Sequence, residues 1–195
     1  MDLLLIHSAI SGKAKKDKRS PLHAVTRQQT WSALVELKAA GRVRAIGVCN
    51  HNPRQLELLF AASGERPDVL QIEYHPMLQR PKILEYCREH GIILQAFGSG
   101  GGGWKLWKKD PVLYGMLSKP PVQAASSQQG RSPTQVSLRW ALEQGLCVIP
   151  KAASPTHQTE NLEVFGWQLT TEQRKASGGT SIGGQAAVAL PIRRA

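Results

Sequence analysis

Short, continuously apolar segments recur along the chain and predict buried β-strands. Runs of this length without polar alternation are typical of strands that are covered on both faces, as in a parallel sheet. The segments are Leu3–Ile6, Ala45–Cys49, Val69–Ile72, Ile92–Phe97 and Cys147–Pro150. The pattern therefore predicts a sheet of parallel strands that is covered by other elements.

Helical patterns fill the intervals between these strands. Trp31, Leu34 and Val35 recur at helical spacing, and this pattern stops at Gly41. Helix starts and apolar faces also appear at Asn52–Pro53 with Leu56, Leu59 and Phe60, at Ile83, Leu84 and Cys87 before Gly91, at Ser132–Pro133 with Val136 and Trp140, and at Ser154–Pro155. A polar cap followed by proline is a common way to begin a helix. Alternating strands and helices predict the α/β fold class.

Two parallel architectures compete, namely an open doubly wound sheet and a closed eight-stranded barrel. The open sheet normally carries a glycine-rich nucleotide fingerprint after an early strand. No such fingerprint follows Ile6 or Cys49. The glycines at Gly98 and Gly100–Gly103 follow a late strand and lack the GK[ST] ending of a phosphate loop. This absence favours the barrel.

Two segments lie outside the repeat. Residues 10–20 hold five basic side chains and one acidic side chain, which indicates a solvated loop. Residues 177–195 are rich in Gly, Ala and Ser without periodicity, and we expect a poorly ordered tail there. One domain is therefore expected over residues 1–176.

Composition narrows the class of protein. Of the 195 residues, 41% are apolar, which is enough for a substantial core. The formal net charge of +11 attracts anions such as phosphorylated cofactors, nucleic acids or acidic membranes. The chain has no apolar run near the roughly 20 residues that cross a bilayer, and its opening MDLLLIH does not resemble a secretory signal. We therefore expect a cytoplasmic protein with no membrane contact, whose three cysteines are buried, reduced thiols.

Five side chains stand at or near the ends of successive predicted strands. They are His7, Asn50, Gln71, Phe97 and Lys151. In a parallel barrel, the carboxyl ends of the strands converge on one mouth, where the catalytic side chains gather. In this order and context, the five residues resemble the aldo-keto reductase superfamily.

Four motifs carry this resemblance, and their order makes a chance match improbable. They are GRVRAIGVCN at 41–50, QIEYHP at 71–76, LRWALEQG at 138–145 and VIPKAASPTHQTEN at 148–161. The match extends over about residues 2–175. It implies the last five strand–helix units of a (β/α)8 TIM barrel, and an enzyme that transfers hydride from NADPH to an aldehyde or ketone.

The resemblance also implies roles for individual residues. His7 matches the family's catalytic histidine, which holds the carbonyl oxygen of the substrate. Asn50 and Gln71 match side chains that bind the nicotinamide carboxamide, and Phe97 stands where an aromatic ring, usually tyrosine, stacks on the nicotinamide. Each of these residues alone would more often be a packing or turn residue, so the prediction depends on the set.

The adenosine end of the cofactor has matching residues near the last predicted strand. Lys151 precedes the helix start at Ser154, where an ammonium group and backbone N–H groups would face the same 2′-phosphate. The resemblance assigns this phosphate to Lys151 and His157, and the adenine to Glu160 and Asn161. His157 stands where the family has arginine, which weakens the expected preference for NADP.

Other departures affect the substrate pocket. Ser8 and Ala9 replace the usual Trp-Pro after the histidine, and His51 replaces an aromatic residue after Asn50. The lysines and tryptophans at 104–109 match a pyrophosphate loop only weakly and are left out of the predicted site. No His/Cys cluster has the spacing of metal ligands, so we expect no metal.

Aligned to the family, the chain begins at the fourth strand of the barrel. The family's Asp, Tyr and Lys would precede Met1, so we expect this chain to be inactive by itself and unstable alone. Its exposed sheet edges would also favour self-association. The competing hypothesis is a noncatalytic interaction protein that binds an acidic partner or nucleic acid through residues 13–19 and 104–109. That hypothesis leaves the match at Asn50, Gln71 and Phe97 unexplained, so we expect a small carbonyl substrate and no nucleic acid.

Overall fold

The computed structural model describes residues 1–10, 22–100 and 115–178. The chain forms two compact units. Unit 1 comprises Met1–Ile72 and Arg80–Gln95, and unit 2 comprises Glu73–Gln79 and Ala96–Ala195.

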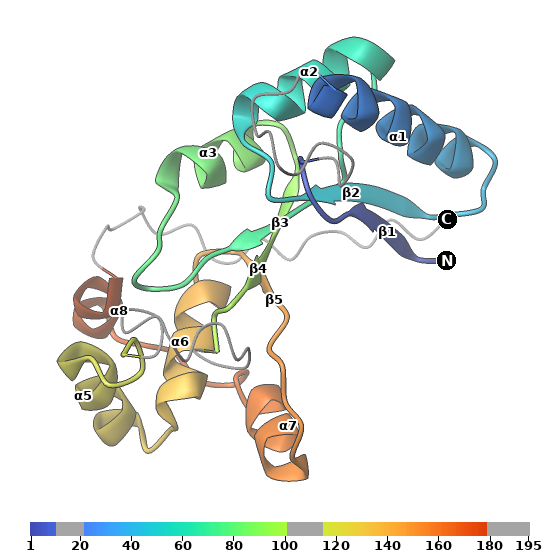
Figure 1. The fold of residues 1–195 in the computed structure, drawn as a ribbon. Helices are drawn as coiled ribbons and strands as arrows, with labels where there is room; N and C mark the ends of the chain where they lie inside the picture. Colours follow the sequence, from blue (N-terminus) through green and yellow to red (C-terminus); the bar gives the residue numbers. More distant parts are fainter. Residues whose placement is uncertain (11–21, 101–114, 179–195) are drawn as a thin grey trace. The chain divides into compact units, whose positions relative to one another are not determined.

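Five strands form one sheet in the order in which they occur along the chain (Figure 1). They are β1 (Leu3–Ile6), β2 (Ala45–Cys49), β3 (Val69–Glu73), β4 (Ile93–Phe97) and β5 (Cys147–Val148). In unit 1, β1 and β3 both pair with β2 in parallel, with Leu3 opposite Ala45 and Cys49 opposite Gln71. Helices separate the strands along the chain, which confirms the predicted α/β class.

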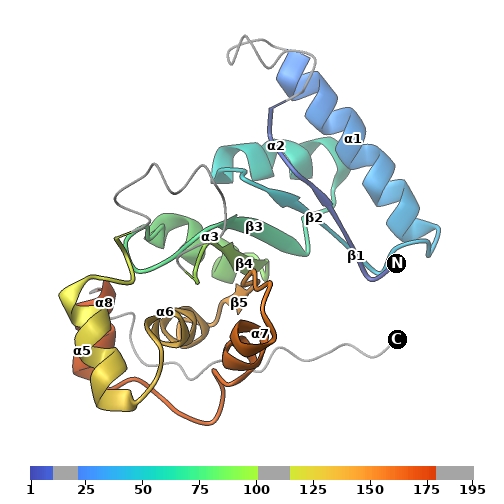
Figure 2. The ribbon, with the colours of Figure 1, turned by 60° about the horizontal axis from the view of Figure 1, so that its bottom comes forward.

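Three helices lie in the part of unit 1 that the structure describes. They are α1 (Leu22–Ala39), α2 (Pro53–Ser63) and α3 (Pro81–Glu89). Figures 1 and 2 show α1 and α2 side by side next to β1 and β2. The α1 residue Trp31 is fully buried, and its indole N–H donates to Ser63 Oγ of α2 at 3.0 Å. Of the three apolar residues predicted on the inner face of α2, Leu56 and Leu59 are buried, whereas Phe60 is exposed at 36%.

Four helices lie in the described residues of unit 2, which are 73–79, 96–100 and 115–178. They are α5 (Pro120–Gln129), α6 (Pro133–Leu142), α7 (Pro155–Leu162) and α8 (Thr171–Gly178). The buried face of α6 includes Val136, Leu138 and Trp140, and α6 begins with the predicted cap, Ser132, in a capping box with Gln135. The sequence patterns did not predict α5 and α8.

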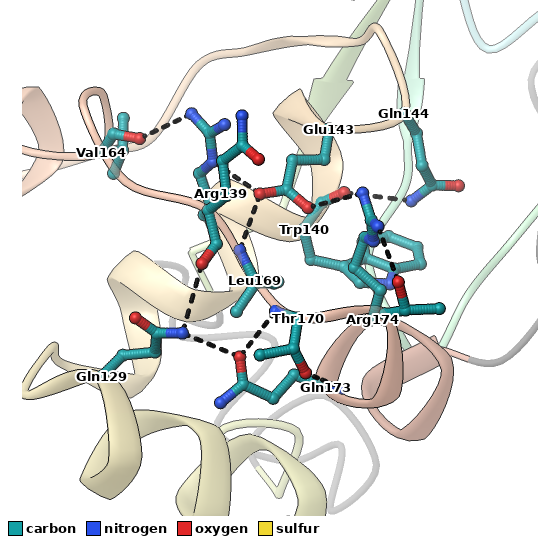
Figure 3. A network of polar contacts seen from close by, with 12 residues as sticks. Gln129, Arg139, Trp140, Glu143, Gln144, Val164, Leu169, Thr170, Gln173 and Arg174 are labelled. Carbon is teal, nitrogen blue, oxygen red and sulfur yellow. Dashed lines mark hydrogen bonds and ion pairs between the residues drawn. The ribbon is translucent and has the colours of Figure 1, made fainter. Parts of the chain in front are cut away.

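Glu143 fastens the segment that leads into α8 (Figure 3). Its side chain is only 5% exposed and accepts from Arg139 Nε at 2.8 Å and from the Leu169 N–H at 2.9 Å. Arg174 of α8 donates to the other carboxylate oxygen at 3.3 Å. One buried carboxylate therefore joins the end of α6, the following loop and α8.

The prediction that all five strands are fully buried is wrong for the two outer strands, β1 and β5. The residues of β1 are half-buried, and β5 covers only Cys147–Val148 instead of Cys147–Pro150. Cys147 is exposed, so the expectation of three buried thiols is wrong for this residue, although Cys49 and Cys87 are buried. The physical reason is position, because β1 and β5 stand last in the strand order and have one paired neighbour each.

The last described helix, α8, runs to Gly178, and its residue Ser177 is buried. In the part of the chain that the structure describes, no helix combines the length and apolarity needed to cross a bilayer.

Candidate functional site

The connection between β2 and α2 contains the best-defined part of the candidate site. It consists of Asn50, His51 and Asn52. Asn50 has a φ of 59°, and among the described residues it is the one non-glycine with positive φ. Asparagine tolerates this left-handed conformation better than most residues do. The chain therefore turns sharply where β2 ends.

Asn50, at the end of β2, is hydrogen-bonded to residues of both neighbouring chain segments, β3 and the end of β1. Its backbone N–H donates to the carbonyl of Gln71 on β3 at 2.9 Å. Its side-chain amide donates to the carbonyl of His7, just past β1, at 3.3 Å. The structure thus brings together three of the residues predicted from the sequence. The imidazole of His7 is exposed to solvent next to this turn.

Gln71 has a polar partner on the next strand that the sequence analysis missed. Its amide donates to Gln95 Oε1 of β4 at 2.6 Å, and both side chains are half-buried. The available signal was a glutamine in the apolar segment ILQAF. Such a residue normally needs a hydrogen-bond partner when the strand is buried.

His51 lies beside Asn50 and is almost fully buried, with 2% exposure. Its Nδ1 contacts the carbonyl oxygen of Cys49 at 2.8 Å, and its Nε2 is buried without a hydrogen-bond partner among the described residues. Burial and, to a smaller extent, the nearby charge of Arg27 lower the pKa of His51 to about 4, against the opposing effect of the Cys49 carbonyl. The imidazole is therefore neutral at physiological pH.

The residues predicted for the adenosine end lie in or just before α7 of unit 2. Ser154 caps the helix, and its hydroxyl accepts from the His157 N–H at 3.2 Å. Pro155 has no N–H, and the N–H of Thr156 belongs to the first helical turn, where backbone N–H groups have no partner within the helix. Lys151 and His157 are exposed, as an anion site requires.

Glu160 and Asn161 lie one turn further along α7. With His157 they have the i, i+3, i+4 spacing of one helix face. The Glu160 carbonyl accepts from the side chain of Gln135 on α6 at 3.0 Å, which fixes α7 against α6. The side-chain oxygen of Asn161 is buried and has no hydrogen-bond partner among the described residues.

Phe97 is the last residue of β4 and is half-buried in unit 2. Its carbonyl accepts from the Tyr74 N–H at 3.2 Å. Unit 1 thus contains His7, Asn50 and Gln71, and unit 2 contains Phe97 and the α7 residues. The roles assigned to these residues remain predictions.

Several other expectations concern residues outside the described ranges. The basic segment at 13–19, the Trp/Lys loop at 104–109 and the tail from 179 onward all fall there. Among the described residues, no group of three His, Cys, Asp or Glu side chains is arranged to hold a metal ion.

Comparisons with known proteins agree with the sequence resemblance. The Aldo/keto reductase family profile matches residues 1–177. The chain is 35% identical over 148 residues to aldo-keto reductase family 1 member A1 of Bos taurus, which covers 76% of this chain and 45% of the bovine protein. The chain therefore spans about half the length of the curated relatives that it matches.

Solved structures show the same relationship. A Gox0644 mutant in complex with NADPH is 35% identical with a TM-score of 0.72, over 91% of this chain and 58% of that one. MGS-M4, an aldo-keto reductase from a deep-sea metagenome library of the Medee basin, is 26% identical with a TM-score of 0.76, over 95% of this chain and 62% of that one. These likenesses confirm the predicted partial TIM barrel. The chain belongs to the aldo/keto reductase family.

Proposed function

We propose that this chain is the cofactor-binding portion of an NADPH-dependent reductase of small aldehydes or ketones. The observation that supports this most strongly is the Asn50 turn, in which one residue is hydrogen-bonded to the backbone of both His7 and Gln71. The complex of Gox0644 with NADPH supports the choice of cofactor.

The nicotinamide end of the cofactor is assigned to unit 1. A carboxamide offers both an N–H donor and a carbonyl acceptor, and a side-chain amide complements both. Asn50 is exposed at the turn, and Gln71 is held on its strand by Gln95. An amide at a fixed position orients the carboxamide and thereby determines which face of the ring meets the substrate.

The adenosine end is assigned to the start of α7. The Lys151 ammonium group and the Thr156 N–H supply positive charge where a phosphate would sit, and the positive end of the helix dipole adds to it. Glu160 and Asn161, one turn further along α7, are assigned to the adenine, as the family resemblance implies. These residues are compatible with NADP.

His7 is assigned to the substrate carbonyl. Bound NADPH supplies the hydride in this chemistry. The His7 imidazole would donate a hydrogen bond to the carbonyl oxygen, where negative charge develops during reduction. Its exposure at the end of β1 leaves the ring accessible to a small substrate.

We expect this chain to bind NADPH without catalysing the reduction of a carbonyl substrate. The family's Asp, Tyr and Lys have no matching residues in the motifs quoted above. Loss of a positioned proton donor costs roughly 10² to 10⁴ in rate. We therefore propose that the 195-residue chain binds NADPH but does not reduce aldehydes by itself. The free cysteines agree with the proposed cytoplasmic location, because the cytosol keeps thiols reduced.

A fluorescence titration with NADPH tests the proposal. Saturable binding is expected, and Asn50→Gly should weaken it because glycine keeps the turn but removes the amide. Arg54→Ala, on the exposed surface of α2, serves as a matched control and should leave binding unchanged.

A parallel titration with single-stranded nucleic acid at two salt concentrations addresses the competing function. Salt-dependent binding of nucleic acid without binding of NADPH would reject the reductase proposal in favour of an interaction protein. Reduction of an aldehyde by the purified chain would contradict the proposal that its catalytic set is incomplete.

A further inference from the structure

We propose that His51 is a positioning residue that fixes the backbone of Asn50, and with it the direction in which the Asn50 amide meets the nicotinamide carboxamide. This inference rests on the proposed function for its consequence in binding. Its structural part, the control of the Asn50 turn, concerns unit 1 alone.

The Asn50 turn needs an external restraint. A non-glycine residue in the left-handed region costs on the order of 1 kcal/mol, and such conformations persist where the surrounding structure determines them. Asn50 is exposed, so close packing of its own side chain does not supply that restraint. The hydrogen bonds of Asn50 to His7 and Gln71 supply part of this restraint, and the residues on either side supply the rest.

The His51 ring supplies it by reaching back across Asn50. Its Nδ1 lies 2.8 Å from the Cys49 carbonyl oxygen, one residue before Asn50, while its own backbone lies one residue after. The hydrogen bond therefore closes a small ring around the Asn50 backbone. Cys49 and His51 are both buried, at 3% and 2% exposure, so water competes little for this bond.

The chemistry of the bond fixes the tautomer of the imidazole. A carbonyl oxygen only accepts, so Nδ1 must carry the hydrogen and Nε2 must present its lone pair. That Nε2 is buried and unpartnered among the described residues. Retaining a buried polar ring with one unsatisfied nitrogen is costly, which argues that the Nδ1 bond has a use that an apolar residue would not serve.

The residues before and after His51 are each held by hydrogen bonds of their own. The Asn50 N–H is bound to Gln71 on β3, and Asn52 forms the capping box of α2 with Gln55. His51 connects these two anchored points. Without the bond between His51 and Cys49, the backbone at Asn50 would become mobile and the direction of the Asn50 side-chain amide would no longer be fixed. The neighbouring elements, β2 and α2, would both stay folded.

Two substitutions separate positioning from packing. His51→Gln keeps an N–H donor that can reach the Cys49 carbonyl, and His51→Phe fills a similar volume without a donor. If His51 positions Asn50, H51F should weaken NADPH binding about tenfold, the equivalent of one lost hydrogen bond, and H51Q should restore most of it. Adenosine 2′,5′-bisphosphate, which lacks nicotinamide, should bind equally to all three chains.

Other results would overturn the inference. Equal weakening for NADPH and the bisphosphate would mean a general loss of structure, and unchanged NADPH affinity would mean that His51 does not act on the site. In an Asn50→Gly background, H51F should cause no further loss, because glycine adopts the turn freely and has no amide to direct. A further loss as large as in the unaltered chain would contradict positioning.

Nuclear magnetic resonance of the unaltered chain gives a test that needs no variant and no cofactor. The ¹⁵N shifts of His51 should show a neutral ring protonated at Nδ1, and the Asn50 backbone shifts should show positive φ. Protonation at Nε2 alone would overturn the inference. If the tautomer is correct but NADPH does not bind, the proposed function fails while His51 still controls the turn.

Discussion

At the scale of single residues, Gly47 shows how closely β1, β2 and β3 approach one another. A Cβ atom added at Gly47 would lie 2.3 Å from the carbonyl oxygen of Val69 and 2.7 Å from Leu5 Cδ2. Backbone on β3 cannot yield as a flexible side chain can. The Gly-Val step in the GRVRAIGVCN motif is thus required by the packing of the strands that carry the candidate nicotinamide site.

Gly47→Ala should therefore destabilise unit 1 by about 1 to 3 kcal/mol. Gly100→Ala provides the matched control, because its added Cβ would have its nearest contact at 3.5 Å, an ordinary van der Waals distance. Urea unfolding followed by tryptophan fluorescence measures both. Equal stability of the two variants would show that β2 and β3 are further apart than described.

His51 predicts a dependence of stability on pH. Burial lowers its pKa from 6.5 to about 4 in the folded chain, so between these values the unfolded chain binds more protons. The free energy of unfolding should fall as the pH drops through this window, by about 3 kcal/mol in total. In H51Q this contribution should disappear, since glutamine does not titrate. An unchanged pH profile in urea unfolding would contradict the burial of His51.

At the scale of elements, the last helix is secured by specific polar contacts. Gln173 Oε1 accepts from Gln129 of α5 and from the Thr170 N–H, both at 2.9 Å (Figure 3). Thr170 in turn accepts from the Gln173 N–H, which completes a capping box. The sequence TTEQ carries this signal, so α8 was predictable from it. Likewise, Pro120 and Gly130 mark the limits of α5.

Removing the charge of Glu143 should loosen this end of unit 2. Glu143→Gln weakens the bonds to Arg139 and Arg174, and the expected loss of stability is about 1 to 3 kcal/mol. Glu163→Gln is the control, because Glu163 is 4.0 Å from Arg131 and both side chains are exposed, so a change below about 1 kcal/mol is expected. Thermal unfolding distinguishes them. Similar losses would indicate that Glu143 is no more important than a surface charge.

At the scale of the whole molecule, the repeating pattern of the sequence was enough to predict the fold class, because buried strands and capped helices each leave a local signal. The burial of β1 and β5 was not predictable, since apolarity shows what a segment prefers and not which neighbours it has. Asn50 and Gln71 were identified through the resemblance, whereas Gln95 and the His51–Cys49 contact depend on which side chains meet in three dimensions.

The edges of the two outer strands lead us to predict that the chain self-associates. Half-buried β1 and the short β5 stand at the two ends of the strand order, and such edges pair readily with other chains. Sedimentation velocity should show a sedimentation coefficient that rises with protein concentration. A single value for a monomer across concentrations would contradict this prediction.

The central claim is that the Asn50 turn and the start of α7 both bind NADPH. Hydrogen–deuterium exchange of the chain with and without NADPH tests it most directly, because it reports on both segments in one experiment. We predict slower exchange with NADPH at residues 50–52 and 156–158, and little change in α3. Unchanged exchange in both segments at saturating NADPH, or protection confined to other parts of the chain, would contradict the account.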